Sequence, residues 1–208
     1  MKTAGLIVFD VDGTLIRGKT VCELIADQIG KSERMSWLER HAGASRETVI
    51  SAREEMADWY FEAGRHAVNK FLPTVSWAPE VRSGVGLLME RRWHVAIASM
   101  TWKFAVEQIA TELGITELTA TGLDWDSAQI DHVFRETKAE YLDDLARRIV
   151  VPRHRVVAVG DSDGDVPMLI AAGHGIYVGQ SDPELTGVVH MPGAGIGDIA
   201  EHVLNLAI

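Results

Sequence analysis

The sequence predicts an α/β fold in which a doubly wound parallel sheet carries a small all-helical segment inserted after its first strand. Four short apolar runs support the sheet, because continuous hydrophobicity is typical of strands buried on both faces of a parallel sheet. Helical spacing between these runs indicates βαβ units, with helices on both faces. Residues 18–78 show helical spacing and no strand-like run, and therefore predict the insert.

Strands are predicted at residues 6–9, 95–98, 156–159 and 175–178. Helices are predicted between the later strands, where residues 106–113 and 142–149 place apolar side chains at i, i+3, i+4 and i+7. This spacing is that of one buried helical face. Gly114 predicts the end of the first helix, since glycine readily adopts the left-handed conformation of a helix stop.

The predicted insert divides the chain into a core of residues 1–17 and 79–208 and a helical cap of residues 18–78. Its helical spacing is clearest at Val49, Ala52, Met56, Trp59 and Ala63. The insert follows directly on the loop that contains Asp10. We therefore expect it to fold back over that loop as a lid.

Composition and charge restrict the classes of function. The chain has 208 residues, of which 47% are hydrophobic and 24% charged, which argues against a largely disordered protein. A net charge of −10, with basic residues scattered among acidic ones, argues against a nucleic-acid partner. An anionic small substrate would therefore need a local positive cluster.

Cysteine usage and apolar run lengths predict a cytoplasmic location. Cys22 is the only cysteine, so no internal disulfide is possible, and we expect a thiol buried in a helix. The N-terminal residues lead straight into a strand without a signal-peptide pattern. No apolar run approaches the roughly 20 residues that span a bilayer, so no membrane association is expected.

Two carboxylates follow the first predicted strand. Asp10 and Asp12 lie two residues apart, so on an extended chain their side chains point to the same side and can address one ligand. Ligands bind parallel sheets at the carboxyl ends of the strands. Gly13 then allows the chain to turn sharply away. These features indicate a catalytic loop.

Ser99 and Met100 follow the second strand at the same edge of the sheet. The hydroxyl of Ser99 and free backbone amides there are suited to hold an anion. In the alternative interpretation, Ser99 or Thr101 caps a helix that begins near Trp102.

Lys138 is predicted at the first position of a helix, because Thr137 and Glu140 have the spacing of a capping box. A cation is unfavourable at a helix N-terminus, where the helix dipole is positive, unless an anion lies close by. The alternative is a solvated surface lysine.

A third acidic loop, at residues 160–165, follows the strand at residues 156–159. Asp161, Asp163 and Asp165 repel one another unless a cation is bound, and hard oxygen ligands suit Mg2+. Asp165 could instead be the N-cap of the following helix, in whose first turn Pro167 fits. The eight histidines show no metal-ligand spacing, so zinc is not indicated.

These four segments resemble, in their order and strand context, the four motifs of the haloacid dehalogenase superfamily of phosphohydrolases. The segments are Asp10-Val11-Asp12-Gly13-Thr14-Leu15, Ser99, Lys138 and Gly160-Asp161-Ser162-Asp163-Gly164-Asp165. The resemblance covers the whole core and implies a Rossmann-like sheet. The helical insert and the run Asp165-Val166-Pro167-Met168-Leu169 look most like the phosphoserine phosphatase branch.

The resemblance implies a Mg2+-dependent phosphatase that acts on a small phosphorylated metabolite through an aspartyl-phosphate intermediate. Asp10 would be the nucleophile and Asp12 the general acid and then base. Ser99, Met100 and Lys138 would bind the phosphoryl group. The implied Mg2+ ligands are the Asp10 side chain, the Asp12 backbone carbonyl and Asp161, with Asp165 bound directly or through a neighbouring group.

Departures from the branch concern the substrate. Lys19 stands near a position where the branch usually has a glutamate for the substrate amino group, which a lysine would repel. Met100 and Gly164 replace a usual glycine and asparagine. Arg53 lies roughly where the branch has an arginine for the substrate carboxylate. Its alternative is a solvated helix face beside Glu54 and Glu55.

Two other functions remain compatible with the sequence. A phosphomutase or phosphotransferase would use the same residues and pass the phosphoryl group to another acceptor. A non-catalytic binding protein on this scaffold would be expected to have lost residues such as Asp10 or Lys138, which are both present.

Overall fold

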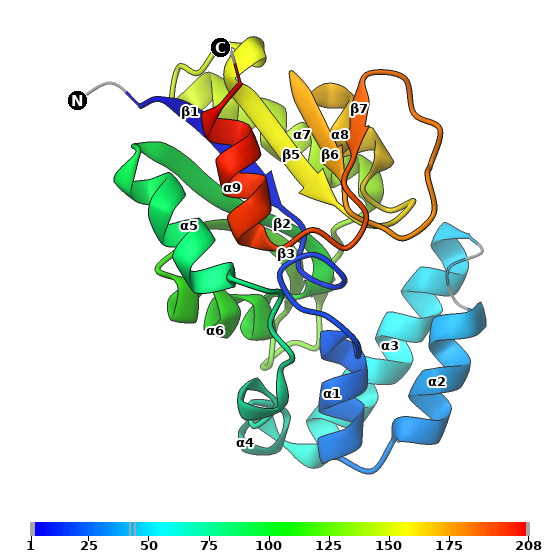
Figure 1. The fold of residues 1–208 in the computed structure, drawn as a ribbon. Helices are drawn as coiled ribbons and strands as arrows, with labels where there is room; N and C mark the ends of the chain where they lie inside the picture. Colours follow the sequence, from blue (N-terminus) through cyan, green and yellow to red (C-terminus); the bar gives the residue numbers. More distant parts are fainter. Residues whose placement is uncertain (1–2, 42, 44, 207–208) are drawn as a thin grey trace.

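The computed structural model describes residues 3–41, 43 and 45–206, and within these residues it contains one seven-stranded sheet (Figure 1). The strand order is β4-β3-β2-β1-β5-β6-β7, and every neighbouring pair is parallel except β3 and β4. The strands are β1 Gly5–Phe9, β2 Trp93–Trp102, β3 Glu117–Leu123, β4 Ile130–Asp131, β5 Val156–Gly160, β6 His174–Tyr177 and β7 Val188–His190.

The central strand β1 is buried along its whole length because each face is covered by helices. Ile7 and Phe9 belong to one hydrophobic cluster, while Leu6 and Val8 belong to another. Figure 1 shows α5 and α9 in front of the sheet and α7 and α8 behind it. This arrangement confirms the predicted doubly wound α/β sheet. The covering helices are α5 Val81–Glu90, α6 Lys103–Leu113, α7 Arg135–Arg148, α8 Val166–Ala171 and α9 Ile196–Leu204.

All four predicted strands are present, and three further strands were not predicted. β3 was missed because its sequence, ELTATGL, alternates polar and small residues and is only half-buried, which hides the apolar signal. β4 and β7 have two and three residues, too few for a pattern. Gly114 ends α6 in the left-handed conformation, with φ of 70°, as predicted.

Residues 18–78 contain helices and no named strand in their described part. The helices are α1 Val21–Gln28, α2 Ser32–His41, α3 Arg46–Ala63 and α4 Arg65–Val68, followed by the 3-10 helix η2 Leu72–Thr74. A capping box starts α1, because Thr20 and Glu23 each accept a hydrogen bond from the other's backbone amide. None of the helices in the described residues is long and apolar enough to cross a membrane.

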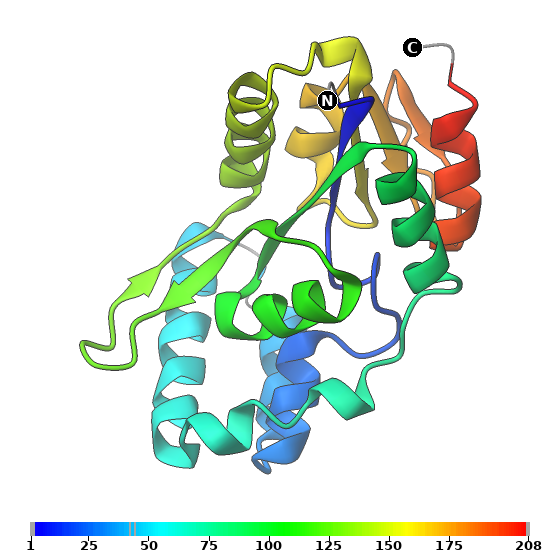
Figure 2. The ribbon, with the colours of Figure 1, turned by 90° about the vertical axis from the view of Figure 1, so that its left-hand side faces the viewer.

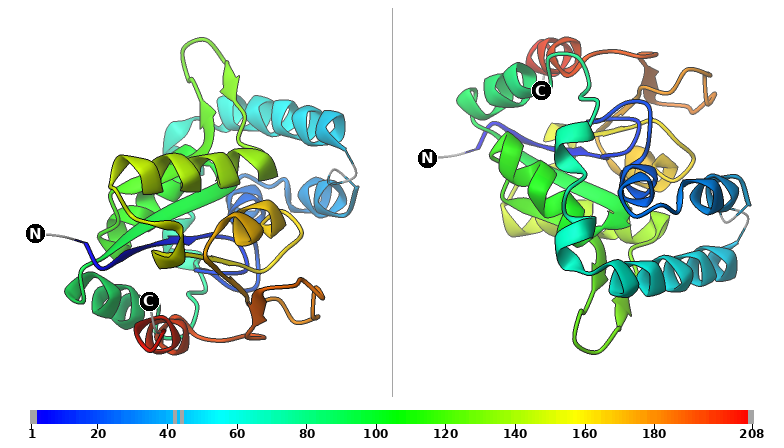
Figure 3. Two further views of the ribbon diagram at one scale, coloured as in Figure 1. Left: turned by 90° about the horizontal axis from the view of Figure 1, so that it is seen from above. Right: turned by 90° about the horizontal axis from the view of Figure 1, so that it is seen from below.

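The two segments that connect the insert to the sheet, residues 15–17 and 76–78, are hydrogen-bonded to each other. The amide of Arg17 donates to Ser76 O at 2.7 Å, and the amide of Ala78 donates to Leu15 O at 2.9 Å. On another side, the hairpin of β3 and β4 lies along α3 (Figures 2 and 3), where the rings of Phe61 and Trp125 pack at 5.4 Å. The insert is therefore held to the core at two places.

Candidate active site

The loop after β1 brings Asp10 and Asp12 to the carboxyl edge of the sheet. Its turn is tight, because the carbonyl of Val11 accepts hydrogen bonds from the amides of three following residues, Thr14, Leu15 and Ile16. Gly13 has a φ of 81°, in the region that favours glycine. Asp10 is 6% exposed. The chain geometry around these carboxylates is thus fixed by the backbone.

Lys138 is the centre of the site. Its side chain is 2% exposed, and Nζ donates to Asp10 Oδ1 at 2.7 Å and to Asp165 Oδ1. Burial alone would lower the pKa of Lys138, but the charges of Asp10 and Asp165 outweigh burial and raise it. A solvated surface lysine, the alternative considered from the sequence, is wrong.

The predicted helical position of Lys138 is also wrong. The helix α7 begins at Arg135, three residues earlier, with Phe134 as its N-cap. Thr137 Oγ1 accepts a hydrogen bond from the Phe134 amide at 3.3 Å, but Thr137 lies inside the first turn, and Phe134 makes no side-chain cap in return. The start of the helix was predicted too late because Phe134 is not one of the residue types preferred at an N-cap.

Ser99 is 1% exposed, and its Oγ accepts a hydrogen bond from the amide of Thr101 at 3.2 Å. The interpretation of Ser99 or Thr101 as a helix cap is contradicted. β2 continues through these residues to Trp102, and α6 starts at Lys103 without any side-chain cap. Ser99 therefore lies in the strand end that faces the Asp10 loop.

Asp165 organises the loop after β5. It stands at the N-cap position of α8, as one interpretation predicted, but its side chain makes no capping bond there. Instead, Oδ2 accepts from the amides of Asp161 and Ser162 at 3.1 Å each and from Ser162 Oγ at 3.0 Å. Gly160 leaves room for this side chain, because a Cβ there would lie 2.4 Å from Asp165 Cβ.

Three carboxylates can hold a cation. Oxygens of Asp10, Asp161 and Asp165 lie within 4.8 Å of one another. Burial and the charge of Asp165 raise the pKa of Asp161 to about 6, so a proton or cation is favoured there. The residues fit Mg2+, which prefers carboxylate oxygens. The Asp12 carboxylate is not in this group, and its Oδ1 accepts from the amide of Val21 at 2.7 Å.

Asp12 has a pKa raised to about 7. Burial is the main cause, and the charges of Glu39 and Asp161 add to it, while the hydrogen bond from Val21 opposes it. Glu39 was missed by sequence reasoning, because nothing in the sequence indicates how α2 is placed over the Asp10 loop. A carboxyl group with this pKa can exchange a proton near neutral pH.

A cavity of about 440 Å³ lies between the loops after β1 and β5 and the helical insert. The core contributes Asp12, Gly13 and Asp161, and the insert contributes mainly apolar side chains together with Glu39 and Arg53. The cavity is lined by Asp12, Gly13, Gly18, Thr20, Cys22, Met35, Leu38, Glu39, Gly43, Val49, Ala52, Arg53, Met56, Met100, Thr101, Asp161 and Ser162.

The two substrate-specificity candidates of the insert are placed differently. Arg53 lines the cavity and is only 5% exposed, so its interpretation as a solvated helix face is wrong. Lys19 is exposed, does not line the cavity, and forms an ion pair with Asp27. Cys22 lies in α1 against Thr101, with 3.4 Å between Sγ and Oγ1, and burial raises its pKa to about 12.

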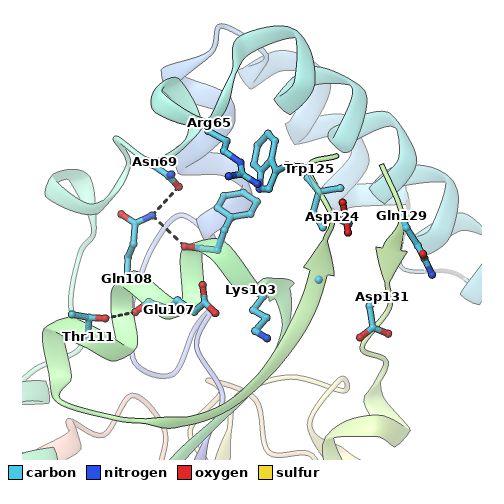
Figure 4. Close-up of a pocket in the computed structure, with 13 residues that line it drawn as sticks. Arg65, Asn69, Lys103, Glu107, Gln108, Thr111, Asp124, Trp125, Gln129 and Asp131 are labelled. Carbon is cyan, nitrogen blue, oxygen red and sulfur yellow. Dashed lines mark hydrogen bonds between the residues drawn. The ribbon is translucent and has the colours of Figure 1, made fainter. Parts of the chain in front are cut away.

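A second and larger cleft, of about 900 Å³, lies between α4, α6 and the β3–β4 hairpin (Figure 4). Its floor includes Phe104 and Trp125, whose rings pack at 5.7 Å, and Arg65 lies over Trp125. None of the predicted site residues lines it. The smaller cavity is the one that reaches the predicted site, through Asp12, Met100 and Asp161.

Comparisons with known proteins concern the sequence and the fold of this chain. A family model described as haloacid dehalogenase-like hydrolase matches residues 7–169. The chain is 27% identical over 202 residues to a phosphoserine phosphatase of Vibrio cholerae, covering 94% of this chain and 61% of that protein. It is 27% identical over 191 residues to a phosphoserine phosphatase of Lactococcus lactis, covering 85% and 84%.

Among solved structures, the fold is similar to that of a phospho-aspartyl intermediate analogue of phosphoserine phosphatase. The TM-score is 0.78 at 21% identity, with 97% of this chain and 99% of that chain covered. The chain spans less than two thirds of the Vibrio cholerae relative, and it spans 44% of phosphoserine phosphatase SerB2 of Mycobacterium tuberculosis.

Proposed function

Because the chain belongs to the haloacid dehalogenase-like hydrolase family, as its four motifs indicated, we propose that it is a Mg2+-dependent phosphatase of small phosphomonoesters. The observation that carries this proposal is the buried arrangement of Lys138 between Asp10 and Asp165 at the carboxyl edge of the sheet. A buried cation beside the proposed nucleophile is suited to bind the phosphoryl group of an anionic substrate.

Asp10 is the proposed nucleophile. Its carboxylate attacks phosphorus and forms an aspartyl-phosphate, while the bond between phosphorus and the alcohol oxygen breaks. In the second step, water attacks the same phosphorus, inorganic phosphate leaves, and the Asp10 carboxylate is regenerated. The hydrogen bond from Lys138 fixes the carboxylate for both steps.

Asp12 is the proposed proton carrier. With a pKa of about 7, it is partly protonated near neutral pH and can donate a proton to the leaving alcohol oxygen. The resulting carboxylate then accepts a proton from the attacking water. The amide of Val21 donates to Asp12 Oδ1 at 2.7 Å and so holds the side chain in place.

Ser99, the backbone at Met100, and Lys138 are the proposed partners of the phosphoryl oxygens. The Asp10 and Asp161 side chains, with the Asp12 carbonyl, would hold Mg2+, which when bound would offset the negative charge of the phosphoryl group. Asp165 supports this set by fixing Lys138 and the loop amides at residues 161 and 162.

The helical insert, residues 18–78, is the proposed cap that selects the alcohol. Its side chains supply most of the apolar lining of the 440 Å³ cavity, together with one anionic group, Glu39. The relatives named phosphoserine phosphatase make phosphoserine the first substrate to test. Lys19 is no obstacle to its amino group, because Lys19 pairs with Asp27 outside the cavity.

The test is phosphate release from a panel of phosphomonoesters that includes phosphoserine, with Mg2+ or with chelator. We expect Mg2+-dependent release that Asp10→Asn abolishes without loss of the fold. Asp161→Asn should raise the Mg2+ concentration needed for half-maximal activity. Retained activity in Asp10→Asn would disprove the covalent mechanism. Turnover that occurs only when an acceptor other than water is added would favour a phosphotransferase.

A further inference from the structure

Arg53 of the insert reaches into the core with a buried guanidinium group. We propose that Arg53 is a positioning residue that orients Ser99 and the start of α7 for phosphoryl binding. The inference rests on the proposed phosphatase function. It assigns the insert a part in building the phosphoryl site, in addition to selecting the alcohol.

The first contact of Arg53 is with an interrupted part of the sheet. The pairing of β2 with β3 shifts register between Ala98 and Trp102, so the backbone there lacks regular ladder partners. The carbonyl of Met100 is satisfied by two side chains instead. Arg53 Nη2 donates to it at 2.8 Å from the insert, and Thr121 Oγ1 donates to it at 2.8 Å from β3.

This carbonyl belongs to the peptide unit that also orients Ser99. The carbonyl of Met100 and the amide of Thr101 are parts of one planar group, so fixing the oxygen also fixes the N–H. That N–H donates to Ser99 Oγ at 3.2 Å. Since the oxygen of Ser99 is thereby held as an acceptor, its hydroxyl hydrogen is left to be donated to a phosphoryl oxygen.

The second contact of Arg53 is with the segment that leads into α7. Nη2 also donates to the carbonyl of Val133 at 2.8 Å, two residues before the helix that carries Lys138. The guanidinium lies 5.2 Å from the centre of the Phe134 ring, and Thr121 Oγ1 accepts from the Val133 amide at 3.3 Å. One nitrogen of Arg53 therefore links two segments that carry proposed phosphoryl ligands.

Burial of the Arg53 guanidinium is energetically unfavourable, which indicates that the position of this group serves a function. Within the described residues, the buried guanidinium forms no ion pair with a carboxylate, and its hydrogen-bond partners are two carbonyls and His132 Nδ1 at 3.3 Å. Burial lowers the pKa of Arg53 to about 10, so it stays charged at neutral pH. Desolvating a charge with only neutral partners is unfavourable.

The test compares Arg53→Met with Arg46→Met. Arg46 is a matched control, because it lies on the same helix and packs on the same Phe134 ring at 3.9 Å, but it is exposed. Each variant is assayed with p-nitrophenyl phosphate and with the best natural ester of the panel. For Arg53→Met we expect kcat to fall by a similar factor, about 10- to 1000-fold, with both esters.

Arg46→Met should stay within about twofold of the parent, because an exposed cation over a ring contributes little. Added guanidinium ion should restore part of the Arg53→Met activity by occupying the vacated position. A loss seen only with esters that carry an anionic group on the alcohol would overturn the inference, since Arg53 would then bind the substrate directly. An unchanged kcat with both esters would overturn it too.

A readout independent of turnover is hydrogen exchange at the Thr101 amide, followed by NMR. We expect faster exchange in Arg53→Met than in the parent or Arg46→Met, and equal rates would contradict the inference. If Arg53→Met does not fold, Thr121→Val removes the other donor to Met100 O and should speed the same exchange. If the proposed phosphatase function is wrong, the parent protein will release no more phosphate than Asp10→Asn does. That result is distinct from the outcomes for Arg53.

Discussion

Replacing Lys138 with methionine is expected to destabilise the protein strongly as well as to inactivate it. Methionine fills a similar volume but leaves the carboxylates of Asp10 and Asp165, which are 8% and 0% exposed, without their cation. Removing one partner of a buried ion pair costs about 3–5 kcal/mol. For a chain of this length each kcal/mol lowers Tm by about 2–4 °C, so the expected loss is roughly 6–20 °C.

The stability lost in Lys138→Met should increase with pH. Burial raises the pKa of Asp10 well above its ordinary value, and Lys138 opposes that rise, so removing Lys138 raises the pKa further. A carboxyl whose pKa is higher in the folded state favours folding when protonated. The stability cost of Lys138→Met should therefore be smallest in acid and grow as the pH rises through the pKa of Asp10.

The assay is urea or thermal unfolding of parent and variant in chelator, at pH 5 and pH 8. Lys31→Met is the control, since Lys31 pairs with Glu62 at 3.3 Å on the surface, where an ion pair contributes about 1 kcal/mol or less. Adding Asp10→Asn to Lys138→Met should recover part of the stability by removing one unpaired charge. A loss below about 1 kcal/mol at both pH values would refute the reasoning.

Two further predictions concern the Asp10 loop. kcat/KM should fall as the pH rises above about 7, because Asp12 must be protonated to act as the acid, and a flat profile from pH 6 to 9 would exclude that role. Gly13→Ala should cost about 1–2 kcal/mol of stability and raise the Mg2+ requirement, since its Cβ would lie 2.0 Å from Asp161 Oδ2 at a φ of +81°. Gly18→Ala, at a φ of +78° with open space around it, should cost similar stability in urea unfolding but leave the Mg2+ requirement unchanged.

The sequence was sufficient for the parts of the site that follow strand ends. The apolar run of β1 predicted where Asp10 and Asp12 would lie, because a buried strand must place the next residues at the sheet edge. The same reasoning placed the loop of Asp161, whereas Ser99, which was expected to follow the second strand, lies within β2. The acid-rich loop was expected to bind Mg2+, which stays a prediction; one of its acids, Asp165, is paired with Lys138 Nζ.

Side-chain contacts between distant elements could not be predicted in this way. The start of α7 was misplaced because its N-cap residue, Phe134, has no capping side chain. The contacts of Arg53 depend on how α3 lies on the β3–β4 hairpin, and β3 itself has too little apolar character to be recognised. The sequence likewise did not indicate that Lys19 pairs with Asp27, since Glu23 is also close to it.

The side chains of β1 point alternately to the two faces of the sheet, and this has a consequence for folding. Its side chains enter two separate hydrophobic layers in turn, so the strand that ends at Asp10 is held by both layers at once. An intermediate in which only one layer has condensed would leave the strand, and with it the nucleophile, without a fixed position. Recovery of activity during refolding would therefore require both layers, whereas the far-ultraviolet signal of the helices would grow with either layer.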